Sequence, residues 1–289
     1  MSVLIFGNPT KSDFQRTVLK LLPLLKKLNL HAETTSECAK ILNLPLFDKT
    51  APKNYSMILS LGGDGTILRA VRAFDNDVPP IVGLNLGRLG FMADISIDES
   101  LDALETLLDS HSRIINQTTI SGSVASAEHS EEHTEFALND IIIHRGNIPH
   151  LIDLAVFVDG CLINTFSADG IIFATPNGST AYSLSAGGPI LDINVDGILI
   201  TPICPHTTLN KSVVVNPKKS INVVYLNDYG PIQINYDGVV HLDFAKGQNF
   251  ICKKGTKEIP FLKPQEYDYF VTLRSKLNWN GLPQGFKKR

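Results

Sequence analysis

The first part of the chain alternates continuous apolar runs with segments in which apolar residues return every three or four positions. The continuous runs predict strands at Ser2–Phe6, Tyr55–Leu61 and Ile81–Asn85. The helical spacing predicts helices at Phe14–Leu28, Ile67–Phe74 and Leu101–Leu108. Pro23 is expected to kink or break the first of these helices. Strands that alternate with helices predict a parallel sheet with helices packed on it.

The pattern changes near residue 113. From there to about residue 262, short apolar or β-branched runs are separated by turn residues, which is typical of a β-rich domain. Asp159-Gly160 and Asp237-Gly238 each lie between two such runs and predict β-hairpins. The stretch Ser121–Glu135 is rich in Ser, Glu and His, and we expect an exposed loop or strand tip there.

These patterns together predict two domains. An α/β N-terminal domain with a Rossmann-like parallel sheet is expected in residues 1–112, and a β-rich C-terminal domain in residues 113–265. A C-terminal segment, residues 266–289, is expected to return to the first domain through the apolar residues Leu273, Leu277 and Trp279.

Composition excludes several classes of protein. Hydrophobic residues make up 43% of the chain and charged residues 19%, enough for a packed core. A formal net charge of −3 provides no basic field for nucleic acid. No apolar run approaches the roughly 20 residues of a membrane span, and the short apolar start lacks a signal pattern, so we expect a cytoplasmic protein. The four cysteines form no Cys-x-x-Cys pair, and Cys204 and His206 have no second pair of ligands, so no zinc site is predicted.

A glycine loop follows the second predicted strand, in the run Gly62-Gly63-Asp64-Gly65-Thr66. Its glycines let a phosphate or ribose approach the main chain at the start of a helix. The carboxylate of Asp64 suits either of two tasks, accepting a proton from a hydroxyl or holding the Mg²⁺ of a triphosphate. Arg69 follows about one and a half helical turns later and could reach a phosphate. The alternative is a plain strand-to-helix turn with Asp64 or Thr66 as the N-cap.

A second loop is the longest informative run, Ser167–Ile190. It consists of an acidic turn at Asp169, an apolar strand, a Pro/Gly loop, a short helix of small residues and a Gly-Gly turn. Small residues let a planar ligand lie close to the helix, and Tyr182 adds a ring and a hydroxyl. A helix that packs tightly on the sheet would also require small residues, even without a ligand. The residues by themselves therefore leave both interpretations open, a ligand-binding helix and a closely packed one.

Both loops resemble a known family. The Gly-Gly-Asp-Gly-Thr run resembles the signature of a superfamily that contains NAD kinases, diacylglycerol-type lipid kinases and phosphofructokinases. The run Ser167–Ile190 resembles the long motif of the NAD kinase family (ATP/polyphosphate-NAD kinases) nearly throughout, and Asn85–Phe91, Thr201–His206 and Leu273–Trp279 extend the resemblance over most of the chain. The resemblance implies transfer of the terminal phosphate of ATP, or of another donor, to the adenosine ribose 2′-hydroxyl of NAD. It also implies Mg²⁺ carried with the triphosphate, near Asp64, and a homo-oligomer (dimer or tetramer).

The resemblance also implies roles for single residues. Asp169 and the segment Thr180–Ser185 are expected to contact the dinucleotide, Asn139 and Asp140 the adenine and ribose, and Phe91 the nucleotide. Asp64 is the expected catalytic residue. The complete set of predicted NAD- or ATP-binding residues is Asp64, Gly65, Arg69, Phe91, Asn139, Asp140, His150, Asp169, Thr180, Ala181, Tyr182, Ser183, Leu184 and Ser185.

Some positions depart from the family pattern. Asp140 stands where Glu is usual, which shortens the carboxylate by one methylene, and Ser167 stands where many members carry Arg. Donor range, acceptance of NADH, allosteric control and oligomer size stay open. Two alternatives remain: a lipid or sugar kinase that shares only the Asp64 loop, and a dinucleotide sensor without catalysis. The run Ser167–Ile190 argues against the first and Asp64 against the second.

Overall fold

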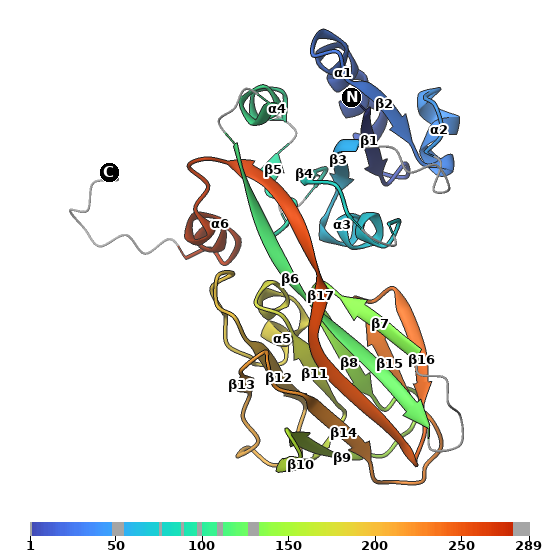
Figure 1. Cartoon of the computed structure of the whole chain (residues 1–289), viewed down its shortest axis with the longest axis vertical. Coiled ribbons are helices and arrows are strands. Elements are labelled where there is room, and N and C mark those ends of the chain that lie inside the picture. The colour runs from blue at the N-terminus through green and yellow to red at the C-terminus, as the bar shows by residue number, and fades with distance from the viewer. Residues whose placement is uncertain are drawn as a thin grey trace, which may run out of the picture. The chain divides into compact units, whose positions relative to one another are not determined.

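The computed structural model describes residues 2–47, 55–74, 77–87, 90–96, 100–108, 112–126 and 133–279. The chain forms two compact units, unit 1 from Met1–Asn116 and Pro260–Arg289, and unit 2 from Gln117–Ile259. The two longest strands, β6 (Ser112–Ser126) and β17 (Gln248–Pro264), pair with each other and carry the chain into unit 2 and back (Figure 1). Residues 88 and 89 of the second glycine segment (Asn85–Phe91) and the basic residues 287–289 lie outside the described ranges.

Unit 1 is built on a parallel sheet, as the alternation of strands and helices predicts. Strand β1 lies between β2 and β3, β3 pairs with β4, and all of these pairs are parallel. The short β5 and the end of β17 also pair with β4 in parallel. The elements of unit 1 are β1 (Ser2–Gly7), α1 (Phe14–Lys27), β2 (His31–Thr34), α2 (Ser36–Leu42), β3 (Tyr55–Gly62), α3 (Asp64–Val71), β4 (Ile81–Asn85), β5 (Ile95–Ser96), α4 (Ser100–Leu108) and α6 (Tyr269–Lys276).

Helix α1 runs through Pro23 without interruption, so the expected break is wrong. The helix buries Phe14, Val18 and Leu21 against the sheet, one face of a 3.6-residue period. Pro23 lies on the opposite, exposed face. The carbonyl of Leu19, which loses its helical donor to Pro23, belongs to an exposed residue and can bond water instead. Burial of the apolar face therefore outweighs the lost hydrogen bond.

Unit 2 is β-rich, with antiparallel sheets packed on a shared apolar core. One sheet has the order β13-β12-β11-β8-β15-β16. In the other sheet, β9 pairs with β10 on one side and with β14 on the other, and β14 also pairs with β17. Side chains from both sheets form one buried cluster. The elements are β7 (His133–Ala137), β8 (Asp140–His144), β9 (Ile152–Val158), β10 (Cys161–Ala168), β11 (Gly170–Ala174), η1 (Asn177–Thr180), α5 (Tyr182–Ser185), β12 (Ile198–Ile203), β13 (Val213–Val215), β14 (Ile221–Tyr225), β15 (Ile232–Tyr236) and β16 (Val240–Phe244).

Both predicted hairpins form. Strands β9 and β10 pair across Asp159-Gly160, and β15 and β16 pair across Asp237-Gly238. Asp159 and Asp237 have positive φ angles of 49° and 54°, a conformation that Asp tolerates better than most residues. The Asp-Gly dipeptide therefore determines the turn at each site.

The first part of the stretch Ser121–Glu135 differs from the exposed loop or strand tip expected there, whereas His133 and Thr134 are exposed. This first part, to Ser126, belongs to β6 and pairs antiparallel with β7, and Gly122, Ser123 and Val124 are buried. A Cβ at Gly122 would lie 2.7 Å from the ring of Phe250, so the close contact with the core requires a small residue. Gly and Ser occur both where a strand packs tightly against a core and in polar loops, so composition alone does not distinguish the two structures. Residues 127–132 lie outside the described part of the chain.

Candidate functional site

Asp64 lies at the carboxyl edge of the parallel sheet, where open α/β sheets bind ligands. Strand β3 ends at Gly62, and α3 begins at Asp64, three positions before its predicted start at Ile67. The Oδ2 of Asp64 accepts a hydrogen bond from the backbone N–H of Phe91 at 2.8 Å. Its Oδ1 accepts from the N–H groups of Met92 at 3.1 Å and Ala93 at 2.9 Å. The carboxylate of Asp64 therefore connects the glycine loop Gly62–Thr66 to the end of the second glycine segment.

These contacts leave Asp64 one open acceptor position. A carboxylate offers about four lone-pair directions, two on each oxygen. Within the described residues, Oδ1 uses both of its directions and Oδ2 uses one. The remaining direction on Oδ2 is available for one hydroxyl or one cation.

The glycines around Asp64 have two different functions. A Cβ at Gly90 would lie 1.9 Å from Oδ1 of Asp64, and a Cβ at Gly62 would lie 2.1 Å from Oγ1 of Thr66, so both glycines permit close packing. A Cβ at Gly63 or Gly65 would meet no atom within 4 Å. The space beside Asp64 is therefore open on the side of Gly63 and Gly65, as a ligand would require.

Two other predicted residues of unit 1 have different surroundings. Phe91 is half-buried, and its ring lies 5.6 Å from the Nζ of Lys276 at the end of α6. Arg69 is exposed on α3, and no ion pair of Arg69 is found among the described residues. Sequence reasoning missed Lys276, whose position within Leu273–Trp279 matched the family without a role attached.

Asp140 begins β8 in unit 2, Asn139 directly precedes it, and both are buried. The backbone of their turn is held by the carboxylate of Asp237, a residue that sequence reasoning assigned only to a hairpin. Its Oδ2 accepts from the N–H of Leu138 at 2.8 Å, and its Oδ1 accepts from the N–H groups of Asn139 at 2.8 Å and Asp140 at 3.2 Å. Asp237 therefore holds two predicted ligand-binding residues in place.

Burial and, to a smaller extent, the neighbouring charge of Asp237 together raise the pKa of Asp140 from 3.8 to about 7. The folded chain therefore holds the Asp140 proton more tightly than the unfolded chain. The stability that this proton provides is complete below the unfolded pKa and is lost as the pH rises through the folded value.

We expect the free energy of unfolding of the wild type, relative to that of Asp140→Asn, to fall between about pH 5 and about pH 8. Urea titrations of both proteins at both pH values measure this difference. The amide cannot ionise, so the comparison removes the contribution of every titrating group that does not interact with Asp140. A difference that stays constant or rises with pH would contradict the raised pKa of Asp140.

The segment after β11 packs against Asn139. The Nδ2 of Asn177 donates to Oδ1 of Asn139 at 2.6 Å, and the Oγ1 of Thr175 donates to the carbonyl of Leu138 at 2.6 Å. A Cβ at Gly178 would lie 2.0 Å from the carbonyl oxygen of Asn139, so this approach requires glycine. The Pro/Gly loop is thus built to meet Asn139, an arrangement that the sequence pattern did not indicate.

The predicted helix of small residues is the 3₁₀ turn η1 followed by the single turn α5. Ser183 is fully buried, and its hydroxyl is 2.9 Å from that of Thr201. Tyr182 and Ser185 are exposed. Thr180, Ala181 and Leu184 are half-buried. Tight packing on the sheet therefore explains Ser183, while the rest of the segment has surface that a ligand could contact.

Asp169 lies at the other end of β11 from Asn139 and Asp140. In the pairing of β11 with β8, Gly170 faces His144 and Ala174 faces Asp140. Four strand steps separate the two ends, about 13 Å at the usual rise. The structure therefore divides the predicted residues of unit 2 between two places along one strand pair, as an extended ligand with two recognised ends would require.

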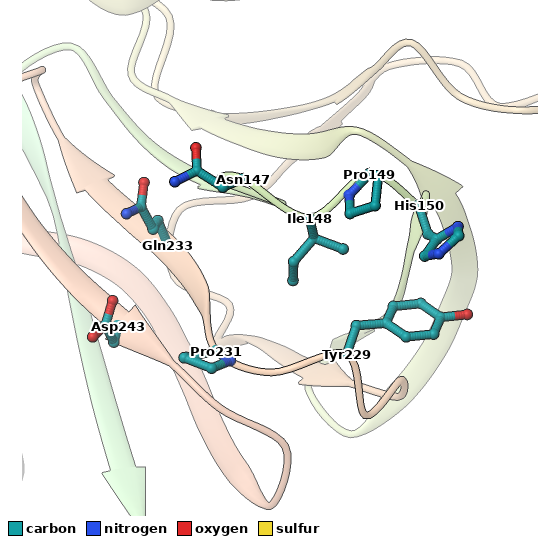
Figure 2. A pocket seen from close by; sticks show the side chains of 9 residues that line it. Asn147, Ile148, Pro149, His150, Tyr229, Pro231, Gln233 and Asp243 are labelled. Atoms are coloured by element: carbon teal, nitrogen blue, oxygen red, sulfur yellow. The ribbon is translucent and has the colours of Figure 1, made fainter.

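The side chain of Asp169 is held by Arg145, another residue that sequence reasoning missed. The Nε of Arg145 donates to Oδ1 of Asp169 at 2.6 Å, and its guanidinium also donates to the carbonyl of Ile148. The same loop continues to His150, whose ring packs on Tyr229 with centroids 5.3 Å apart. Both rings line a hollow of about 550 Å³, together with Asn147, Gln233 and Asp243. Figure 2 shows the lining side chains. His150 thus lines this hollow, and Asp169 does not.

Within the described ranges, no three His, Cys, Asp or Glu side chains are grouped so that they could hold a metal ion. None of the helices described is both long and apolar enough to cross a membrane.

Comparison with known proteins agrees over both units. Residues 4–112 match the family model of the ATP-NAD kinase N-terminal domain, and residues 138–263 match that of the ATP-NAD kinase C-terminal domain. An NAD kinase of Protochlamydia amoebophila is 38% identical over 279 residues, which cover 96% of this chain and 98% of the relative. One of Desulforamulus reducens is 32% identical over 280 residues, which cover 95% and 97%.

Solved structures give the same result. Yeast NADH kinase in complex with NADH is similar with a TM-score of 0.89 at 26% identity, covering 99% of this chain and 90% of that one. An NAD kinase from Archaeoglobus fulgidus in complex with ATP is similar with a TM-score of 0.75 at 26% identity, covering 97% and 100%.

Proposed function

Because this chain belongs to the NAD kinase family, we propose that it transfers the terminal phosphate of ATP to the adenosine ribose 2′-hydroxyl of NAD, giving NADP. The observation in the structure that best supports this reaction is the geometry of Asp64. Its carboxylate is fixed by backbone N–H groups, keeps one acceptor position open among the described residues, and faces open space at Gly63 and Gly65.

The reaction needs a hydroxyl that attacks and a phosphate that leaves its donor. The ribose 2′-oxygen forms a bond to the terminal phosphorus, the bond from that phosphorus to the bridging oxygen breaks, and the hydroxyl proton must leave. Oδ2 of Asp64 accepts this proton or orients the hydroxyl. A single open position on Oδ2 holds one partner at a time, so a hydroxyl bound there excludes a cation at the same position.

A divalent cation, Mg²⁺, is part of the proposal. One carboxylate oxygen together with triphosphate oxygens and water suits Mg²⁺, which keeps several waters and takes few protein ligands. Oδ2 of Asp64 would provide that one contact only while no hydroxyl occupies it, which fits a metal that arrives with the donor rather than one resident in the protein. When bound, the ion neutralises negative charge on the triphosphate.

The dinucleotide is assigned mainly to residues of unit 2. Asn139 pairs with the base edge, Asp140 with ribose hydroxyls, and Asp169 with the nicotinamide end or its ribose. The half-buried and exposed members of Thr180–Ser185 line the dinucleotide, and Phe91 of unit 1 contacts the nucleotide. Support comes from their arrangement: Asp237 holds the backbone of Asp140 and Arg145 holds the carboxylate of Asp169, at opposite ends of the β8–β11 pair.

The first test is a coupled assay of the purified protein with Mg²⁺-ATP and NAD, in which an NADP-specific dehydrogenase detects NADP. We expect NADP from the wild type. Folded protein that makes no NADP, even when polyphosphate or NADH is offered, would refute the proposed reaction. Tight NAD binding in that same preparation would then favour a dinucleotide sensor, and phosphorylation in a panel of lipids and sugars would favour the related kinases.

We also propose a cytoplasmic homo-oligomer. Cys38, Cys161, Cys204 and Cys252 are all free, as in proteins of a reducing compartment. Strand β13 is an edge of the six-stranded sheet, and its Val213 and Val214 are 41% and 46% exposed, apolar surface of the kind that a second copy covers. Light scattering coupled to gel filtration would measure the mass, and a monomer at micromolar concentration would contradict the oligomer.

A further inference from the structure

Lys276, the last residue of α6, places a positive charge next to the Asp64 loop. Its Nζ lies 5.6 Å from the centre of the Phe91 ring, within the range of a cation–π contact. The backbone N–H of Phe91 donates to Oδ2 of Asp64, the oxygen that keeps an open acceptor position. The cation and this carboxylate oxygen therefore flank the same residue.

Among the described residues, no carboxylate lies within ion-pair distance of Lys276, in contrast to Lys263 of the same region. The Nζ of Lys263 is 2.6 Å from Oδ1 of Asp94, and both side chains are buried, so its charge is neutralised inside the protein. Lys276 takes part in none of the ion pairs found among the described residues, although it is half-buried.

The surroundings of Lys276 favour a negatively charged ligand. Partial burial lowers the pKa of Lys276, and the carboxylates of Asp64 and Asp94 act in the opposite direction. A cation that has lost part of its hydration and has no ion-pair partner gains most from an anion that brings its own charge.

Resting on the proposed reaction, we propose that Lys276 binds the terminal phosphate of the donor during transfer. That phosphate must come within bonding distance of the hydroxyl held at Asp64, so it also comes close to the cation beside Phe91. Lysine is a compact point charge that suits a phosphate whose position changes as its bond to the bridging oxygen breaks. Negative charge on the leaving diphosphate is stabilised in the same way.

The experiment compares Lys276→Met, Lys276→Arg and the control Arg274→Met. Met keeps an apolar stem of similar length against Phe91 and removes the charge, whereas Arg keeps the charge. Arg274 is exposed on the same helix, so its replacement removes an equal charge away from the site. Steady-state kinetics would give KM for ATP and for NAD separately, and titration with the magnesium complex of a non-hydrolysable ATP analogue would give its Kd.

For Lys276→Met we expect kcat/KM for ATP to fall and the Kd of the analogue to rise by about 10- to 100-fold, the usual effect of one lost bond to a charged group. KM for NAD and the melting temperature should stay near those of the wild type. Lys276→Arg should recover much of the loss, and Arg274→Met should behave as the wild type. Inorganic polyphosphate, if it serves as a donor, should show the same loss, because it offers the same phosphate chain.

Three results would overturn the assignment. In one, KM for NAD rises while KM for ATP stays unchanged, which would assign Lys276 to the dinucleotide. In another, Lys276→Arg is as impaired as Lys276→Met and both melt early, which would make Lys276 a packing residue. In the third, Lys276→Met has wild-type constants. Wild-type enzyme that makes no NADP would refute the kinase reaction itself, which separates the two proposals.

A measurement on the wild type covers the case in which Lys276→Met does not fold. Limited acetylation with acetic anhydride, read by mass spectrometry, reports the accessibility of each lysine amine. The non-hydrolysable analogue with Mg²⁺ should protect Lys276 several-fold, whereas NAD alone should not. Equal labelling of Lys276 with and without the analogue would contradict the proposal.

Discussion

Replacing Asp64 by alanine is expected to lower kcat for NADP formation by about 10²- to 10⁴-fold, the usual contribution of a positioned acid–base group. NAD binding should be retained, because the residues assigned to the dinucleotide are mainly those of unit 2. The coupled assay measures kcat, and calorimetric titration measures the Kd of NAD. Turnover near that of the wild type would exclude Asp64 from the mechanism.

The structure adds a second consequence of this change. Alanine leaves the N–H groups of Phe91, Met92 and Ala93 without their acceptor, so the second glycine segment loses its attachment to α3. Asp64→Asn keeps one side-chain oxygen. In one orientation this oxygen accepts from Met92 and Ala93, and the NH₂ group faces the N–H of Phe91. In the other orientation the oxygen accepts from Phe91, and the NH₂ group faces Met92 and Ala93. We therefore expect Asp64→Asn to be as inactive as Asp64→Ala but to lose less stability in urea unfolding.

Asp13→Ala is a matched control for both variants. Asp13 precedes α1 in the same unit, and its side chain makes no capping hydrogen bond. Its replacement removes an equal charge without releasing a loop, so activity and stability should stay near those of the wild type. Equal losses in Asp13→Ala and Asp64→Ala would mean that unit 1 responds only to its net charge.

Replacing Asp237 by alanine is expected to lower the free energy of unfolding by about 3 kcal/mol or more. The change removes the acceptor of three buried backbone N–H groups, and each unsatisfied group costs roughly 1–3 kcal/mol. Alanine is also less tolerant than aspartate of the positive φ of 54° at this position. NAD affinity should fall with stability, because the turn of Asn139 and Asp140 is no longer held.

Asp159 provides the matched control for Asp237. It occupies the same position in an Asp-Gly hairpin with a φ of 49°, but it is exposed and its carboxylate accepts only from the N–H of Ser220 and from Lys219 among the described residues. Asp159→Ala therefore has a similar backbone cost without the loss of a buried clamp. Urea unfolding of both variants would separate the two costs, and equal losses would contradict the role of Asp237 in holding the turn.

Several features of this protein followed from short stretches of sequence. The alternation of apolar runs with helical spacing predicted the parallel sheet, because each strand and helix buries one continuous apolar face. The two Asp-Gly dipeptides predicted their hairpins, because Asp and Gly adopt the turn conformation at little cost. The glycine loop located Asp64, because a close approach to the backbone between a strand and a helix requires residues without side chains.

Other features were decided by contacts between residues far apart in the chain. Asp64 accepts from an N–H group 27 positions later, and Asp237 accepts from Asn139, 98 positions away. Lys276 meets Phe91 only because α6 folds onto unit 1. Likewise Pro23 stays within a helix because tertiary burial of the apolar face compensates for a local loss. A local pattern specifies which residues can bond, but the three-dimensional fold decides which partner lies within the distance of about 3 Å that a hydrogen bond needs.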